Sequence, residues 1–167
     1  VTPGDHFRLA GNRLVVMAAN GQEIEVQSAR DLLAPSVESV ALPGAAVPLG
    51  GYARQWLEGA GLLSALAPRL VVTEHARASV VALDQGHADT AIVYATDARH
   101  ARSSRLAYVI PDAEQPAIVY AAALTRKGRD SIPAAEFYRF LMGPETGRTL
   151  EAAGFLPPDP ATWERSE

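Results

Sequence analysis

Short apolar runs alternate along this chain with segments in which apolar residues recur every three or four positions. The runs occupy residues 13–19, 37–42, 69–72, 90–94, 106–110 and 117–124. Such runs are typical of buried strands, and the helical spacing that follows several of them, as in residues 52–63, is typical of amphipathic helices. Strands alternating with helices predict an α/β fold with a mostly parallel sheet and helices on both of its faces.

The residues between these segments predict where the helices begin and end. Thr73 stands where it would cap a helix, and Gly86 stands where a left-handed residue would stop that helix. Pro133 falls in the first turn of a helix over about 133–142, and a last helix follows over about 145–153. The residues from 156 to 167 are rich in proline and then polar, which indicates a loose tail.

Two interpretations of the first apolar run stay open. Residues 13–19 form a buried strand that a turn at Asn20 and Gly21 closes. Alternatively, the same residues are the first half of a hairpin through that turn, with the alternating segment Glu23–Val26 as its second half.

Composition and charge exclude several classes of function. The chain has 167 residues, 48% of them hydrophobic, which suffices for one domain or two small lobes. The net charge of -4, without a basic stripe, makes a nucleic-acid partner a poor fit. The absence of cysteine excludes disulfides and thiolate metal sites, and no apolar run reaches the length of a membrane span. Val1–His6 has neither the basic start nor the apolar core of a secretory signal.

A candidate anion site lies at three places in the middle of the chain. Gly50 and Gly51 leave the backbone uncrowded at a helix start, where N–H groups approach an oxyanion. Ala76 is the third residue of the helix that Thr73 caps, and Tyr94 ends a buried strand at its carboxyl edge. Each place also has an ordinary interpretation: a flexible loop, an N–H satisfied by the Thr73 side chain, and a core tyrosine.

No catalytic or metal-binding constellation stands out. The four histidines are scattered without metal-ligand spacing: His6, His75, His87 and His100. Asp84, Asp89 and Asp97 invite an acid–base interpretation, but helix ends and caps explain each of them. The sequence contains no nucleophile elbow, phosphate-binding loop or dinucleotide fingerprint. We therefore expect a binding protein and not an enzyme, with no catalytic residues and no metal ligands.

Several motifs resemble one known family, in order and in spacing. They are VPLGGYA at 47–53, TEHARASVVAL at 73–83 and DTAIVYATDA at 89–98, with further matches at 110–112, 117–120, 137–141, 143–145 and 153–155. Together they resemble the periplasmic molybdate-binding proteins of ABC importers, and the first three resemble the second lobe of those proteins. The resemblance extends from about Leu9 to Phe155.

The resemblance implies the fold of type 2 periplasmic binding proteins, with two lobes and a ligand cleft between them. Residues 22–112 would form the second lobe. Residues 1–21 and 113–167 would form the remainder of the first lobe. The initial strand, serine-bearing loop and helix of that first lobe would be missing, since the chain begins inside it. The missing part would be an absent segment or a separate N-terminal fragment.

The resemblance also implies the ligand and its contacts. Backbone N–H groups at Leu49 and Ala76 and the hydroxyl of Tyr94 would bind molybdate or tungstate as an oxyanion, with Gly50, Gly51 and Thr73 in support. Family members often carry a smaller residue at the first position and a branched one at the second, which backbone donors tolerate. The remaining ligands come from first-lobe loops and have no counterpart here. No cofactor is implied.

The implied function is to bind molybdate in the periplasm and deliver it to the membrane permease of an ABC importer. A ligand-sensing domain of a transcription regulator with the same fold is the alternative. A helix-turn-helix upstream would favour the regulator, and a signal peptide would favour transport.

Overall fold

The computed structural model describes residues 6–157, and the chain forms two compact units. Unit 1 consists of Val1–Asn12 and Ala117–Glu167, and unit 2 consists of Arg13–Pro116. The expectations for the first five residues, and for most of the tail after 156, lie outside the described residues. Each unit is described by itself.

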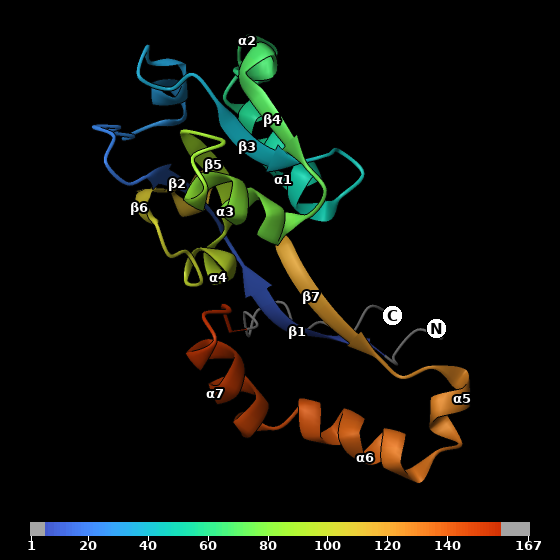
Figure 1. The fold of residues 1–167 in the computed structure, drawn as a ribbon. Helices are drawn as coiled ribbons and strands as arrows, with labels where there is room; N and C mark the ends of the chain where they lie inside the picture. The colour runs from blue at the N-terminus through green and yellow to red at the C-terminus, as the bar shows by residue number, and fades with distance from the viewer. Residues whose placement is uncertain (1–5, 158–167) are drawn as a thin grey trace. The chain divides into compact units, whose positions relative to one another are not determined.

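Unit 2 is built on a five-stranded sheet in the order β4-β3-β5-β2-β6 (Figure 1). Its strands are β2 (Leu14–Ala19), β3 (Val40–Pro43), β4 (Leu70–Thr73), β5 (Thr90–Tyr94) and β6 (Ser104–Val109). Strand β3 pairs in parallel with β4 and β5, whereas β2 is antiparallel to both of its neighbours. Four of the five strands therefore share a direction, and the predicted mostly parallel α/β fold is confirmed.

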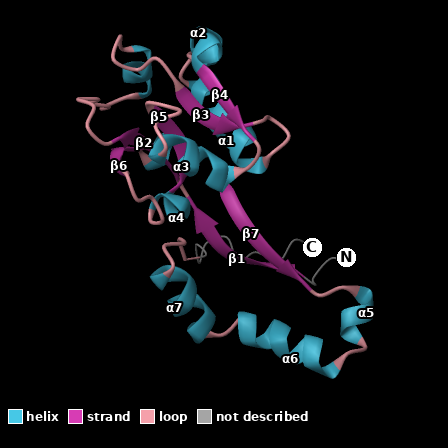
Figure 2. Cartoon of the chain, in the orientation of Figure 1, coloured by secondary structure: helices cyan, strands magenta, loops and turns pink. Residues whose placement is uncertain are grey.

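The helices of unit 2 follow the strands (Figure 2). They are η1 (Ala29–Leu33), α1 (Pro48–Gly59), α2 (Leu63–Leu66), η2 (Ala67–Arg69), α3 (Ala76–Asp84), α4 (Ala95–Ala98) and η3 (Asp112–Glu114), where η denotes a 3-10 helix. Val80 and Leu83 of α3 pack with Val15, Met17 and Val93 of the sheet. In β2, β3 and β5 the alternate residues are equally buried, so both faces of these three strands are covered, which explains why they are apolar throughout. The outer strands β4 and β6 are partly exposed.

The position of strand β2 decides between the two interpretations of residues 13–19. It lies in the sheet between β5 and β6, and residues 23–26 form no strand, so the hairpin interpretation is wrong. The division of the chain falls after Asn12 and after Pro116, whereas we expected lobe boundaries at residues 22 and 112. Because β2 exchanges its hydrogen bonds with β5 and β6, it belongs to unit 2.

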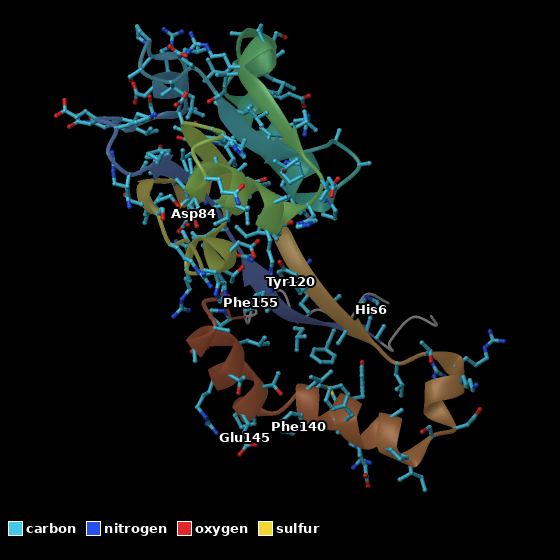
Figure 3. All side chains as sticks on the ribbon, in the orientation of Figure 1. His6, Asp84, Tyr120, Phe140, Glu145 and Phe155 are labelled. Carbon is cyan, nitrogen blue, oxygen red and sulfur yellow. The ribbon has the colours of Figure 1, made fainter. Side chains whose placement is uncertain are left out.

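Unit 1 contains an antiparallel pair of strands, β1 (His6–Asn12) and β7 (Ile118–Ala123). Three helices follow: α5 (Arg126–Arg129), α6 (Ile132–Leu141) and α7 (Pro144–Ala152). Tyr138 of α6 makes an edge-to-face contact with Phe7 of β1, and Tyr120 of β7 makes another with Phe155, which Figure 3 labels. These aromatic pairs hold the helices to the two-stranded sheet.

The predicted helix ends are partly confirmed. Gly86 and Gly154 stop their helices in the left-handed conformation, with φ of 73° and 93°. The helix predicted over about 133–142 begins and ends one residue earlier, at Ile132 and Leu141. No helix among the described residues has both the length and the apolar character that a membrane span requires.

Candidate functional site

The carboxyl ends of three neighbouring parallel strands in unit 2 carry the predicted site. Strands β3, β4 and β5 end at Pro43, Thr73 and Tyr94, and β3 lies between the other two. Helix α1 follows β3 and helix α3 follows β4 (Figure 1). Because parallel strands present their carboxyl ends at one sheet edge, the starts of both helices and Tyr94 share that edge.

Helix α1 begins with two free backbone donors. Leu49 is its second residue, after Pro48, and the Leu49 side chain is buried. Among the described residues, no acceptor bonds the N–H of Leu49 or of Gly50, whereas the N–H of Gly51 reaches the carbonyl of Val47 at 3.0 Å. The first turn of α1 therefore offers two N–H groups at the positive end of the helix dipole.

The expected role of Gly50 and Gly51 as an uncrowded pair is wrong for Gly50. A Cβ at Gly50 would stand 2.2 Å from the carbonyl oxygen of Gly44 and 2.4 Å from that of Pro43. A Cβ at Gly51 would meet only the carbonyl oxygen of Ala45, at 3.8 Å. Gly50 is needed because the helix start packs directly on the backbone that leaves β3, and Gly51 has no such constraint.

Arg54 fixes the first turn of α1 to the end of β3. Its Nη1 donates to the carbonyl of Pro43 at 2.7 Å and to the carbonyl of Gly50 at 2.9 Å. One guanidinium thus bridges the strand end and the helix start, and it adds a positive charge close to the two donors. Sequence reasoning missed this residue, because its contact with Pro43 depends on how α1 packs on the end of β3.

The cap of α3 is His75, which corrects the prediction for Thr73. The His75 Nδ1 accepts the N–H of Ala78 at 3.1 Å, and α3 begins at Ala76, which is its first residue and not its third. The Thr73 hydroxyl instead shares a hydrogen bond with the buried hydroxyl of Ser79, at 2.7 Å. Among the described residues, the N–H groups of Ala76 and Arg77 have no acceptor.

Tyr94 occupies the expected position at the strand end. It is the last residue of β5 and the residue before α4, and its backbone pairs with Leu14 of β2. Its side chain is half-buried. Leu49, Ala76 and Tyr94 are therefore brought to one sheet edge, with Gly50 and Gly51 in the first turn of α1 and Thr73 at the end of β4.

Two of the three candidate aspartates, Asp84 and Asp89, accept hydrogen bonds from backbone N–H groups. Burial alone would raise the pKa of Asp84, but the hydroxyl of Ser104 and the N–H groups of Arg102 and Ser103 hold that pKa below its usual range. Figure 3 labels Asp84 at the end of α3. Burial alone would also raise the pKa of Asp89. Its carboxylate accepts hydrogen bonds from the side chains of Gln22 and Ser39 and from two backbone N–H groups, which lower that pKa below its usual range.

Asp97 differs from these two. Burial raises the pKa of Asp97, although nearby Arg77 and His100 act in the opposite direction. These three side chains line part of a cavity of about 370 Å³ between α3 and the segment that begins with α4. No set of three histidine and acidic residues suited to a metal ion occurs among residues 6–157.

Open α/β sheets bind ligands at the carboxyl ends of their strands, and helix starts bind anions, so this edge has the form of a ligand-binding domain. The chain belongs to the bacterial extracellular solute-binding proteins, whose family model matches residues 1–156. The family is defined by the binding of solutes, which agrees with the expectation of a binding protein.

Curated relatives confirm the resemblance predicted from the motifs. The molybdate-binding protein ModA of Haemophilus influenzae is 28% identical over 152 residues, which cover 88% of this chain and 59% of that protein. ModA of Escherichia coli is 27% identical over 109 residues, covering 65% of this chain and 42% of the relative. A putative ABC transporter substrate-binding lipoprotein of Bacillus subtilis is 24% identical, with coverages of 90% and 58%. The chain thus spans about half of these relatives.

Solved structures show the same fold. The periplasmic molybdate-binding protein of Azotobacter vinelandii matches 95% of this chain and 70% of its own, with a TM-score of 0.77 and 22% identity. The substrate-binding domain of a putative molybdenum ABC transporter from Clostridium difficile matches 93% of this chain and 67% of its own, with a TM-score of 0.78 and 21% identity. At such identities the likeness concerns the fold.

Proposed function

We propose that this chain is part of a periplasmic protein that binds molybdate, and also tungstate, and delivers it to the permease of an ABC importer. One observation carries the proposal: two helix starts with free N–H groups stand at adjacent strand ends, in a chain whose relatives are molybdate-binding proteins. The proposed protein binds and releases its anion without chemical change, and it needs no cofactor.

The proposed ligands are the N–H groups of Leu49 and Ala76 and the hydroxyl of Tyr94. Each of them donates, so an unprotonated dianion satisfies all three at once. Gly50 and Thr73 support these donors by keeping the two helix starts close to their strand ends. Gly51 contributes by leaving the α1 turn open to the ligand.

Donors alone favour molybdate and tungstate over hydrogen phosphate. Hydrogen phosphate carries a proton that needs an acceptor, and an unpaired buried group costs about 1–3 kcal/mol. Sulfate carries no such proton and must be rejected by size. The same reasoning predicts that tungstate, with the same charge and shape as molybdate, binds with similar affinity.

The test is a titration of the isotope-labelled chain with molybdate, tungstate and phosphate, followed by amide NMR. We expect the amide signals of Leu49, Gly50 and Ala76 to move with both metal oxyanions. The binding is expected to be weak, because the first-lobe ligands are not in this chain. Tyr94→Phe should weaken it further, and Tyr138→Phe, which removes the same hydroxyl group from α6 of unit 1, is the matched control. Equal responses to phosphate and molybdate would contradict the selectivity argument.

We also propose a polypeptide partner for unit 1, the separate N-terminal fragment considered above. Ile132, Phe137 and Phe140 of α6 are 75%, 61% and 51% exposed, although helices that are apolar on both faces are normally buried. A two-stranded sheet is only marginally stable by itself, so β1 and β7 would gain stability from further strands beyond their contact with α6. The relatives extend well beyond the region that this chain spans, and the equivalent of that extra length would cover this face.

The partner is tested by adding the segments of the Haemophilus influenzae relative that lie outside the matched region. We expect a one-to-one complex in sedimentation and altered signals from Phe137 and Phe140, whose stacked rings offer a ready apolar surface. The double variant Phe137→Ser, Phe140→Ser should lose the complex and keep the fold of unit 2. A complex that forms equally with the double variant would refute this use of α6.

A further inference from the structure

Helix α1 extends from the proposed anion donors to a second polar contact at its other half. It is a single helix of 12 residues, and about 10 Å of helix separates Leu49 from Trp56 along the axis. Trp56 is only 3% exposed, and its indole N–H donates to the Glu114 carboxylate at 3.2 Å. A displacement at the helix start is therefore carried to Glu114, since a hydrogen-bonded helix moves nearly as a rigid rod.

Glu114 stands at the point where the chain leaves unit 2. It is the last residue of η3, and Pro116 is the last residue of the unit. Between them, the side chain of Gln115 makes three hydrogen bonds, accepting from the N–H of Leu14 at 2.8 Å and donating to the carbonyls of Leu14 at 2.8 Å and Ile110 at 3.0 Å. The entry to unit 2 at Arg13 and its exit at Pro116 are thus held together.

A cavity lies beside the Trp56–Glu114 hydrogen bond. A hollow of about 540 Å³ lies between the last turns of α1 and residues 113–116, with Trp56, Glu114 and Gln115 in its lining. Because few packed atoms join the end of α1 to residues 113–116 across this hollow, the Trp56–Glu114 hydrogen bond is a large part of the contact between them. Glu114 itself is exposed, so its carboxylate lies at the edge of this hollow, and removing it takes away the protein acceptor of the Trp56 indole N–H.

We propose that Glu114 is a positioning residue that couples the anion-binding start of α1 to the two crossings between the units. The inference rests on the proposed function, because it takes Leu49 and Gly50 as the donors. Through Trp56, a movement of α1 toward a bound oxyanion shifts Glu114, and Gln115 passes the shift to Leu14 at the other crossing. Anion binding and the conformation of the crossings are then linked.

The experiment uses the full labelled chain and three variants. Glu114→Ala removes the acceptor, Glu114→Gln keeps an acceptor oxygen, and Asp112→Ala removes a carboxylate from the same short helix without touching α1. Asp112 is a suitable control because its side chain is 85% exposed and its ion pair with Arg13, at 3.7 Å, involves no residue of α1. Amide and indole N–H signals are recorded without ligand and during a molybdate titration.

We expect the Trp56 indole signal of the wild type to move along the same titration curve as the amides of Leu49 and Gly50. Glu114→Ala should raise the dissociation constant at least threefold and uncouple the indole signal. Glu114→Gln should restore both, and Asp112→Ala should behave as wild type. A purely structural role would lower the melting temperature of Glu114→Ala and leave the dissociation constant unchanged.

The ligand-free spectra separate the two hypotheses. Glu114→Ala should shift the amide signals of Leu49 and Gly50 before any anion is added, and Asp112→Ala should not. If those signals keep their wild-type positions, the coupling is wrong, whether or not molybdate binds. If no amide of the wild type responds to molybdate, the proposed function fails, while the coupling is still decided by the ligand-free spectra.

Discussion

The adjacent glycines at the start of α1, Gly50 and Gly51, have different structural roles. Gly50 is a packing residue, because backbone carbonyls of Pro43 and Gly44 occupy the space that a side chain would need. Gly51 faces open space and is exposed. The position of the donors in the proposed site thus depends on Gly50, whereas Gly51 is not needed for the packing of the helix start.

Gly50→Ala and Gly51→Ala make a matched pair. Gly50→Ala should lower the free energy of unfolding by about 3 kcal/mol, since rigid backbone must move away from the added methyl group. Gly51→Ala should raise it by roughly 0.5–1 kcal/mol, because alanine loses less backbone freedom in a helix. Urea unfolding of both variants measures the difference. Similar losses for the two would show that the helix start is looser than described.

Asp84 should make stability depend on pH in the acid range. Its folded pKa lies below the unfolded value of 3.8, so its carboxylate stabilises the fold above that value, and the contribution is lost as the pH falls through the lower folded pKa. Asp84→Asn should cost about 1–3 kcal/mol at neutral pH. Urea unfolding of variant and wild type should converge below pH 3.8; a constant difference down to low pH would contradict this assignment.

Among the helices and strands, those that depend on a local sequence pattern were predicted, and those that depend on contacts between distant segments were not. Strand β5 was predicted at its observed bounds, because both of its faces are covered and its residues are apolar without interruption. Strand β1 was missed, because its half-exposed pattern becomes a strand only through pairing with β7, more than a hundred residues away. Pairing between distant segments leaves no local mark.

The candidate site shows the same division. The sheet edge was predictable, because strand ends and helix starts follow from apolar periodicity and turn residues. The cap of α3 was not, because Thr73 has the commoner capping side chain and only the backbone geometry selects His75. The contacts of Arg54 and Gln115 with distant carbonyls depend on tertiary structure and could not be read from spacing.

His75→Asp tests the cap and the site together. Aspartate caps a helix well and interacts favourably with its dipole, so the free energy of unfolding should stay within about 1 kcal/mol of the wild type. The added negative charge beside Ala76 should weaken molybdate binding several-fold. His75→Ala should instead lower stability by about 1 kcal/mol. Thermal unfolding and the NMR titration give the two quantities; unchanged binding in His75→Asp would argue against Ala76 as a ligand.

For the molecule as a whole, the two units differ in how complete they are. Unit 2 has a five-stranded sheet, a buried core and all three proposed ligands, whereas unit 1 has a two-stranded sheet and an α6 whose phenylalanines are exposed. Residues 13–116 expressed alone should therefore unfold cooperatively in urea and give a dispersed amide spectrum. A spectrum typical of an unfolded chain would show that unit 2 depends on unit 1.

The bonds between Gln115 and Leu14 bring the two ends of unit 2 together. The chain therefore enters unit 2 at Arg13 and leaves it at Pro116 at nearly the same place. A linker across so small a gap can be short, and closing a short loop costs little chain entropy. Unit 2 is accordingly suited to circular permutation: a short linker joining residues 13 and 116, with new termini in a surface loop, should leave its sheet intact.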